Sequence, residues 1–204
     1  MSEVLLFSPI RTGSTLIYNI LKHLKFIVLK RHLLKVMPKI KNVIITYRNP
    51  LDSLSSLFLK ENMNINSLTV NDLNWGIDTL KEQGLDKLIK IFNNEKFLYL
   101  KYELFVHNYS YIYKKLEKYL NITISSKDKT DIYKKFNINS VKKSIKRFNN
   151  FLEWDKNTLL HGNHISKYNG DSHYKKTFTK EQINYITNKL TTHLTILNYK
   201  IENT

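Results

Sequence analysis

Two short segments of the chain combine an arginine with hydroxyl side chains, a combination suited to binding phosphate-like anions. The first is residues 8–15, SPIRTGST, and the second is residues 47–56, YRNPLDSLSS. Each follows an apolar run, at 4–7 and 43–46, so each is expected to leave a buried strand and enter a helix. Free N–H groups at a helix N-terminus bind anions, and arginine and hydroxyl groups add further donors. Two such turns could hold one ligand with a phosphate at each end.

The first turn has the side chains of an anion site but not those of the common nucleotide-binding loop. Gly13 would let the backbone approach a ligand closely, Ser14 and Thr15 offer hydroxyls, and Arg11 offers a charged fork. The second glycine and the lysine of G-x-x-x-x-G-K-[ST] are missing, which argues against an ordinary ATPase or GTPase. The turn alone leaves open an ordinary strand–turn–helix capped by hydroxyls.

The second turn depends on a bend in the chain. Arg48 and Ser56 are eight residues apart, which is roughly 12 Å along a straight helix. They can converge on one anion only if the chain folds back before the helix starts, and Asn49-Pro50 favours such a bend. The alternative is a surface ion pair between Arg48 and Asp52.

A histidine lies between the two turns in the sequence. His32 follows Lys30-Arg31 and the end of an expected strand, and histidine is the natural general base near neutral pH. A lone histidine is usually structural, but this one is expected at the same sheet edge as both turns. It is therefore a candidate catalytic base.

In this order the segments resemble the sulfotransferases that use 3′-phosphoadenosine 5′-phosphosulfate (PAPS). Residues 11–15 look like that family's phosphosulfate loop, 30–32 like its Lys-Thr-His, and 47–56 like its 3′-phosphate segment. Residues 98–103 are similar to its Tyr-Glu segment, and 162–179 are more loosely similar to its C-terminal segment. Each motif alone is weak, whereas the ordered set with matched spacing is specific.

The resemblance implies roles for individual residues and a PAPS cofactor, with adenosine 3′,5′-bisphosphate as product and no metal. His32 would be the base, Lys30 and Arg11 would hold the sulfonate, and Arg48 with Ser56 would bind the 3′-phosphate. The full expected cofactor-binding set is Arg11, Thr12, Gly13, Ser14, Thr15, Arg48, Ser56, Tyr102, Lys167, Tyr168 and Gly170.

The chain departs from the family pattern at both ends of the expected site. Arg11 stands where many members have lysine, and Leu16 stands where they have an adenine-stacking tryptophan. The C-terminal Arg-Lys-Gly triplet is absent, and Lys167, Tyr168 and Gly170 are its substitutes in this interpretation. The family's dimerisation motif is not visible, so the oligomeric state stays open.

Apolar runs and helical periodicity predict the elements that position these residues. Strands are expected at 4–7, 26–29, 43–46 and 97–100, and helices at 14–24, 51–60, 69–92 (as one or two), 108–120, 126–136, 140–147 and from 180 onward. Alternating strands and helices predict a parallel sheet. The expectation is a three-layer α/β/α fold of P-loop NTPase-like sulfotransferase architecture, as a single domain over 1–204. In such sheets ligands bind at the carboxyl ends of the strands.

Composition restricts the classes of protein further. The chain has 204 residues, a net charge of +16 and no cysteine, which excludes disulfide scaffolds and cysteine-ligated metal sites. No run approaches the roughly 20 apolar residues of a membrane span, so a soluble cytoplasmic protein is expected. The basic charge favours an anionic ligand, but the lysines are scattered and no nucleic-acid-binding signature is present.

The resemblance thus implies sulfuryl transfer from PAPS to a hydroxyl or amine of a small-molecule or glycan acceptor. The acceptor pocket is expected from the segment after His32 and from 62–75 and 149–176. His161, His164 and His173 invite a metal site, which is not expected because no acidic or cysteine partners accompany them. The alternatives are a non-catalytic nucleotide-binding domain of the same fold, a basic nucleic-acid-binding protein and a small-molecule kinase.

Overall fold

Four parallel strands form the centre of the computed structural model, which describes residues 2–34, 38–150, 152–162 and 172–201. The strands are β1 (Glu3–Phe7), β2 (Ile27–Arg31), β3 (Asn42–Tyr47) and β4 (Leu98–Lys101). Their order across the sheet is β2-β1-β3-β4, and every neighbouring pair is parallel. The carboxyl ends of the strands therefore meet at one edge.

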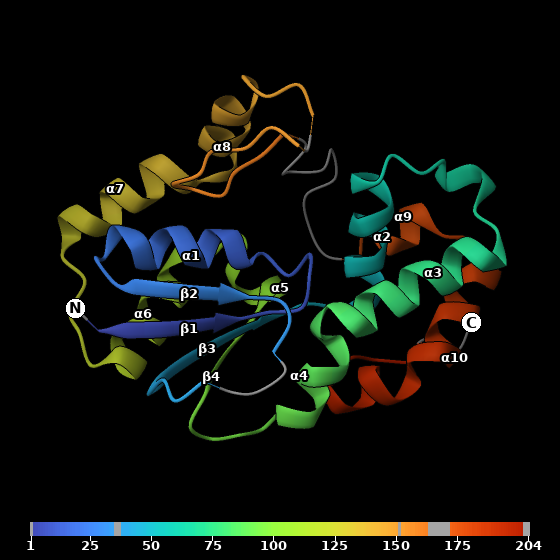
Figure 1. Ribbon diagram of the computed structural model, residues 1–204, viewed down its shortest axis with the longest axis horizontal. Coiled ribbons are helices and arrows are strands. Elements are labelled where there is room, and N and C mark those ends of the chain that lie inside the picture. Colours follow the sequence, from blue (N-terminus) through green and yellow to red (C-terminus); the bar gives the residue numbers. More distant parts are fainter. Residues whose placement is uncertain (1, 35–37, 151, 163–171, 202–204) are drawn as a thin grey trace.

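Helices connect and flank the strands (Figure 1). They are α1 (Ser14–His23), α2 (Pro50–Lys60), α3 (Val70–Leu80), α4 (Asp86–Ile91), α5 (Tyr102–Phe105), α6 (Tyr109–Leu120), α7 (Ser126–Phe136), α8 (Ile138–Ile145), α9 (Tyr174–Thr177) and α10 (Lys180–Ile196). A 3₁₀ turn, Ile65–Ser67, precedes α3, and a π turn, Lys81–Leu85, joins α3 to α4. In the described part of the chain, no helix combines the length and apolarity needed to cross a membrane.

The core is divided between the two faces of the sheet because successive side chains of a strand point to opposite faces. Leu5 and Phe7 of β1 pack with residues of α2, α3, α4 and α10. Val4 and Leu6 of the same strand pack with α1, α5, α6 and α7. Helices thus cover both faces, which confirms the predicted α/β/α layering with a central parallel sheet.

The strand order creates a crevice at the carboxyl edge of the sheet. Strands β1 and β3 are neighbours, but the helices that follow them, α1 and α2, pack on opposite faces. Ligands bind at such a switch point in open α/β sheets. The fold therefore places the turn after β1 and the turn after β3 on either side of one crevice.

The predicted elements agree with the structure to within a few residues, and the short helices α5 and α9 were not predicted. The expected helical region 69–92 is divided by the π turn, where Gly84 has φ +111°. Capping boxes fix two helix starts, at Thr69 before α3 and at Thr179 before α10.

Candidate functional site

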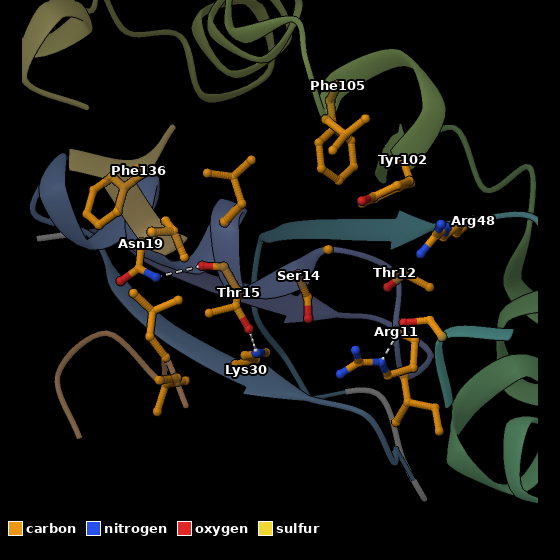
Figure 2. A pocket seen from close by; sticks show the side chains of 18 of the residues that line it. Arg11, Thr12, Ser14, Thr15, Asn19, Lys30, Arg48, Tyr102, Phe105 and Phe136 are labelled. Carbon is orange, nitrogen blue, oxygen red and sulfur yellow. Dashed lines mark hydrogen bonds between the residues drawn. The ribbon is translucent and has the colours of Figure 1, made fainter. Parts of the chain in front are cut away.

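A cavity of about 450 Å³ opens at the carboxyl edge of the sheet (Figure 2). Ten of the thirteen residues predicted from the sequence line it, namely Arg11, Thr12, Gly13, Ser14, Thr15, Lys30, His32, Arg48, Ser56 and Tyr102. The other three, Lys167, Tyr168 and Gly170, lie outside the described residues. The structure thus brings segments far apart in the sequence to one pocket.

The turn after β1 depends on a glycine with a left-handed backbone. Gly13 is the N-cap of α1 with φ 76°, and no side chain caps the helix there, so the first N–H groups of α1 are available to an anion. A Cβ at Gly13 would lie 2.7 Å from Cδ2 of Tyr102 and 3.0 Å from Cζ of Phe105. The close packing of Tyr102 on this turn therefore requires glycine.

Thr12 has a mainly structural part in the turn. Its hydroxyl donates to the carbonyl of Pro9 at 2.8 Å and shares a hydrogen bond with the hydroxyl of Thr46 at 2.9 Å. The side chain is buried. These bonds fasten the turn after β1 to the end of β3.

Arg11 connects the two predicted anion turns. Its backbone is left-handed, with φ 63°, and its Nε donates to Oγ of Ser56 on α2 at 3.0 Å. Burial, with a smaller contribution from the charge of Arg48, lowers the pKa of Arg11 to about 10. The guanidinium remains charged at neutral pH, in surroundings that favour an anionic partner.

Lys30 lies on the other side of the first turn. Its Nζ donates to Oγ1 of Thr15 at 2.9 Å (Figure 2). Burial and then the charge of Arg11 lower the pKa of Lys30 to about 8. An anion bound between these two cations would raise the pKa of the lysine again.

His32 is held in the tautomer that a general base needs. Its Nδ1 is 2.8 Å from the carbonyl oxygen of Ser8. Because a carbonyl only accepts, Nδ1 carries the proton and Nε2 carries the lone pair. Burial is the main cause that lowers the pKa of His32, so the ring is neutral at pH 7.

The π turn supports the backbone around His32. A Cβ at Gly84 would lie 2.6 Å from the carbonyl oxygen of His32 and 3.2 Å from Cα of Pro9. The N–H of Ile10 donates to the carbonyl of Gln83 at 3.3 Å. The π turn therefore packs directly on the two loops that carry the candidate base and the first predicted anion turn.

The end of β3 is fixed by residues that follow β4. The guanidinium carbon of Arg48 lies 4.2 Å from the ring centroid of Tyr102. Glu103 accepts from the N–H of Asn49 at 2.8 Å and from the hydroxyl of Tyr199 at 3.0 Å. The sequence indicated Tyr102 but not Glu103 as functional, although Glu103 holds the bend beside Arg48.

Asp52 has a different partner from the one considered in the sequence. Its carboxylate accepts from the backbone N–H groups of Ser172 and Tyr174, both at 3.0 Å. Both Asp52 and Arg48 are buried, so the alternative of a surface ion pair between them is wrong. Asp52 instead fastens the segment before α9 to the first turn of α2.

Leu16, which stands where the family has an adenine-stacking tryptophan, lines the pocket together with other apolar side chains. The wall there is built from α5, the start of α6 and the α7–α8 junction, through Phe105, Val106, Tyr109, Phe136, Ile138 and Val141. The sequence did not indicate α7 and α8 as pocket elements. The expected contribution from 62–75 was wrong, because no residue of that range lines the pocket; Trp75 instead stacks on Phe58 with centroids 6.2 Å apart.

A short hairpin closes the remaining side, in partial agreement with the expected contribution of 149–176. Trp154 and His161 form an antiparallel bridge, and the amide of Asn19 on α1 donates to the carbonyl of Thr158 at 2.8 Å. The hairpin thereby presents Leu159, Leu160 and His161 to the pocket.

The pocket is strongly positive. Arg11, Lys30, Arg48 and Lys60 line it, and no aspartate or glutamate is among its lining residues in the described ranges. The three histidines of the metal alternative do not form one site: His161 lines the pocket, His173 bonds Ser55 at 2.8 Å, and His164 lies outside the described residues. Within those ranges, no three His, Cys, Asp or Glu side chains are placed to hold a metal ion.

Comparison with known proteins supports the fold. No protein-family model matches the sequence, and no curated protein sequence matches it. Among solved structures, the crystal structure of mouse sulfotransferase SULT7A1 complexed with PAP matches with a TM-score of 0.60. The match covers 97% of this chain and 87% of that chain at 15% sequence identity. The chain therefore has a sulfotransferase-like α/β fold.

Proposed function

We propose that this protein transfers a sulfuryl group from PAPS to a hydroxyl group of an acceptor. The observation that carries the proposal is the convergence of three segments on one pocket that has cations and no described carboxylate. These segments are the Arg11–Thr15 turn, the end of β2 with Lys30 and His32, and the Arg48–Ser56 segment. A donor with phosphates at both ends of a nucleoside needs this arrangement.

The residues present fit such a donor. The N-terminus of α1, with Arg11 and Lys30, would hold the phosphosulfate, and Arg48 with Ser56 would hold the 3′-phosphate. The adenosine would lie against Tyr102 and the apolar wall from α5–α8. The bound PAP in the mouse structure supports the choice of nucleotide.

His32 supplies the base for the transfer in this proposal. Its Nε2 takes the acceptor hydroxyl proton while the acceptor oxygen forms a bond to sulfur. The bond between sulfur and the bridging phosphate oxygen breaks, and that oxygen keeps the electron pair. Lys30 and Arg11 stabilise the negative charge on the equatorial and leaving oxygens, as in other in-line displacements of this kind.

The test is transfer of ³⁵S from labelled PAPS to a panel of phenols, alcohols and sugars. His32→Ala should lower the rate by about 10²–10⁴-fold and leave binding of adenosine 3′,5′-bisphosphate (PAP) within about twofold, because the base does not contact the nucleotide phosphates. Unchanged turnover would remove His32 from the mechanism. PAP binding with no labelled product from any acceptor would instead favour a non-catalytic nucleotide-binding domain.

A further inference from the structure

Two consecutive residues at the start of α5 hold two consecutive residues at the end of β3. The guanidinium carbon of Arg48 lies over the ring of Tyr102, 4.2 Å from the ring centroid. The carboxylate of Glu103 accepts from the N–H of Asn49 at 2.8 Å. Tyr102 thus contacts the side chain of Arg48, and Glu103 fixes the backbone immediately after it.

The ring of Tyr102 is itself held in place. The ring of Phe105, three residues later on α5, packs against it edge to face, with the centroids 5.5 Å apart and the planes at 76° (Figure 2). The backbone of Gly13 also approaches the ring, so closely that a Cβ there would lie 2.7 Å from Cδ2. Tyr102 therefore offers Arg48 a surface that does not have to be ordered when a ligand binds.

A contact of this kind orients a cation without neutralising it. The face of an aromatic ring attracts a guanidinium through its quadrupole and carries no net charge. Burial raises the pKa of Tyr102, while the charge of Arg48 acts in the opposite direction, so the phenol is neutral at pH 7. A carboxylate in the same place would compete with an anionic ligand for the arginine. The ring instead leaves the positive charge of Arg48 to a phosphate.

We propose that Tyr102 is a positioning residue that sets the preference of the donor site for a 3′-phosphate. Its ring holds Arg48 in the orientation that binds this group, so the entropy of ordering a long side chain is lost on folding rather than on binding. This role differs from a contact with the adenosine, which would favour every adenine nucleotide equally. The inference rests on the proposed function, because it concerns how Arg48 is held once Arg48 is assigned to the 3′-phosphate.

The test compares PAP with AMP by calorimetry, because only PAP has the 3′-phosphate. Tyr102→Leu removes the ring and should weaken PAP binding by about tenfold but AMP binding by less than about threefold. Tyr102→Phe keeps the ring face and should restore PAP affinity to within about twofold of the wild type.

A second tyrosine of the same pocket provides the matched control. Tyr109 lines the apolar wall, and its hydroxyl donates to the carbonyl of Phe136 at 2.6 Å. Tyr109→Leu makes the same chemical change as Tyr102→Leu at a position that serves only the wall. Any loss of affinity in Tyr109→Leu should therefore be the same for PAP and AMP.

A pair of ring variants changes only the charge distribution of the ring and keeps its shape. Phenylalanine and pentafluorophenylalanine at position 102 occupy nearly the same space, but fluorination reverses the quadrupole that attracts the guanidinium. The fluorinated protein should bind PAP about five- to tenfold more weakly than the phenylalanine variant, and AMP within about twofold. This comparison tests the proposal even if Tyr102→Leu does not fold.

The outcomes separate this inference from the proposed function. If the wild-type protein binds PAP no better than AMP, the proposed function fails at its 3′-phosphate site. If the wild type prefers PAP but Tyr102→Leu weakens both nucleotides equally, or the two ring variants bind PAP equally well, Tyr102 does not act through Arg48. In that case the inference alone is overturned.

Discussion

Nε of Arg11 donates a hydrogen bond to Oγ of Ser56 at 3.0 Å, across the crevice between β1 and β3. Arg11 comes from the turn that would bind the phosphosulfate, and Ser56 from the helix that would bind the 3′-phosphate. The bond uses one donor of the guanidinium and leaves its other N–H groups for an anion. The two ends of the proposed donor site are therefore mechanically connected by one side-chain contact.

Ser56→Ala should weaken PAP binding by about tenfold, or about 1.4 kcal/mol. The change removes a hydroxyl from the proposed 3′-phosphate site and leaves Nε of Arg11 without its acceptor. AMP, which lacks the 3′-phosphate, should lose less, and calorimetry with both nucleotides measures the difference.

A buried serine one turn earlier provides the matched control. Ser53 lies on the same helix, and its Oγ has no hydrogen-bond partner among the described residues, so Ser53→Ala should leave PAP affinity unchanged. Equal losses for PAP and AMP in Ser56→Ala would show that Ser56 does not contact the 3′-phosphate.

PAP affinity should fall as the pH rises through about 8. The pKa of Lys30 is lowered to about 8 by burial and Arg11, and a bound polyanion would raise it again. The protein with Lys30 protonated therefore binds PAP more tightly. The contribution of Lys30 to PAP affinity is complete below pH 8 and is lost above it. Titrations between about pH 7 and pH 9 avoid the second phosphate pKa near 6.

Lys30→Arg isolates this effect, because arginine stays charged over the whole range. The variant should bind PAP with little dependence on pH between about 7 and 9. The same decline in the variant as in the wild-type protein would mean that another group is responsible.

Gly84→Ala should damage turnover more than nucleotide binding. The alanine Cβ would lie 2.6 Å from the carbonyl oxygen of His32, at a backbone φ of +111°, so the π turn and the His32 loop must separate. Displacement of a catalytic base by a fraction of an ångström lowers the rate by about 10–100-fold, whereas PAP affinity should change by less than about threefold.

The neighbouring residue supplies the control for this variant. Gln83→Ala keeps the backbone carbonyl that accepts from Ile10, so its turnover should match the wild type. A Gly84→Ala protein that folds, binds PAP and transfers the sulfuryl group at the normal rate would show that the π turn does not position His32.

The sequence predicted the sheet and both anion turns because the signals there are local. Continuous apolar runs give buried strands, and Gly13 and Pro50 mark the helix starts that follow them. The positions of the predicted side chains then follow from the rule that parallel strands end at one edge. Ten predicted site residues meet in one pocket for this reason.

The rest of the pocket depends on tertiary contacts that periodicity does not encode. Helical spacing identifies the buried face of α7 and α8, but not that Phe136 and Val141 face a cavity beside Leu16. In the same way, Gly84 in a helical pattern gives no sign of its contact with His32, 52 residues earlier. The role of Glu103 also depends on residues far away in the sequence, since its carboxylate accepts hydrogen bonds from Asn49 and Tyr199.

The most direct measurement of the central claim is calorimetry of the wild-type protein with PAP, AMP, adenosine 3′-monophosphate and ATP. If the two turns are the ends of one donor site, PAP should bind at least about tenfold tighter than either monophosphate. ATP should bind more weakly than PAP because it lacks a 3′-phosphate for Arg48 and Ser56. Equal affinity for PAP and AMP, or tighter binding of ATP, would contradict the account.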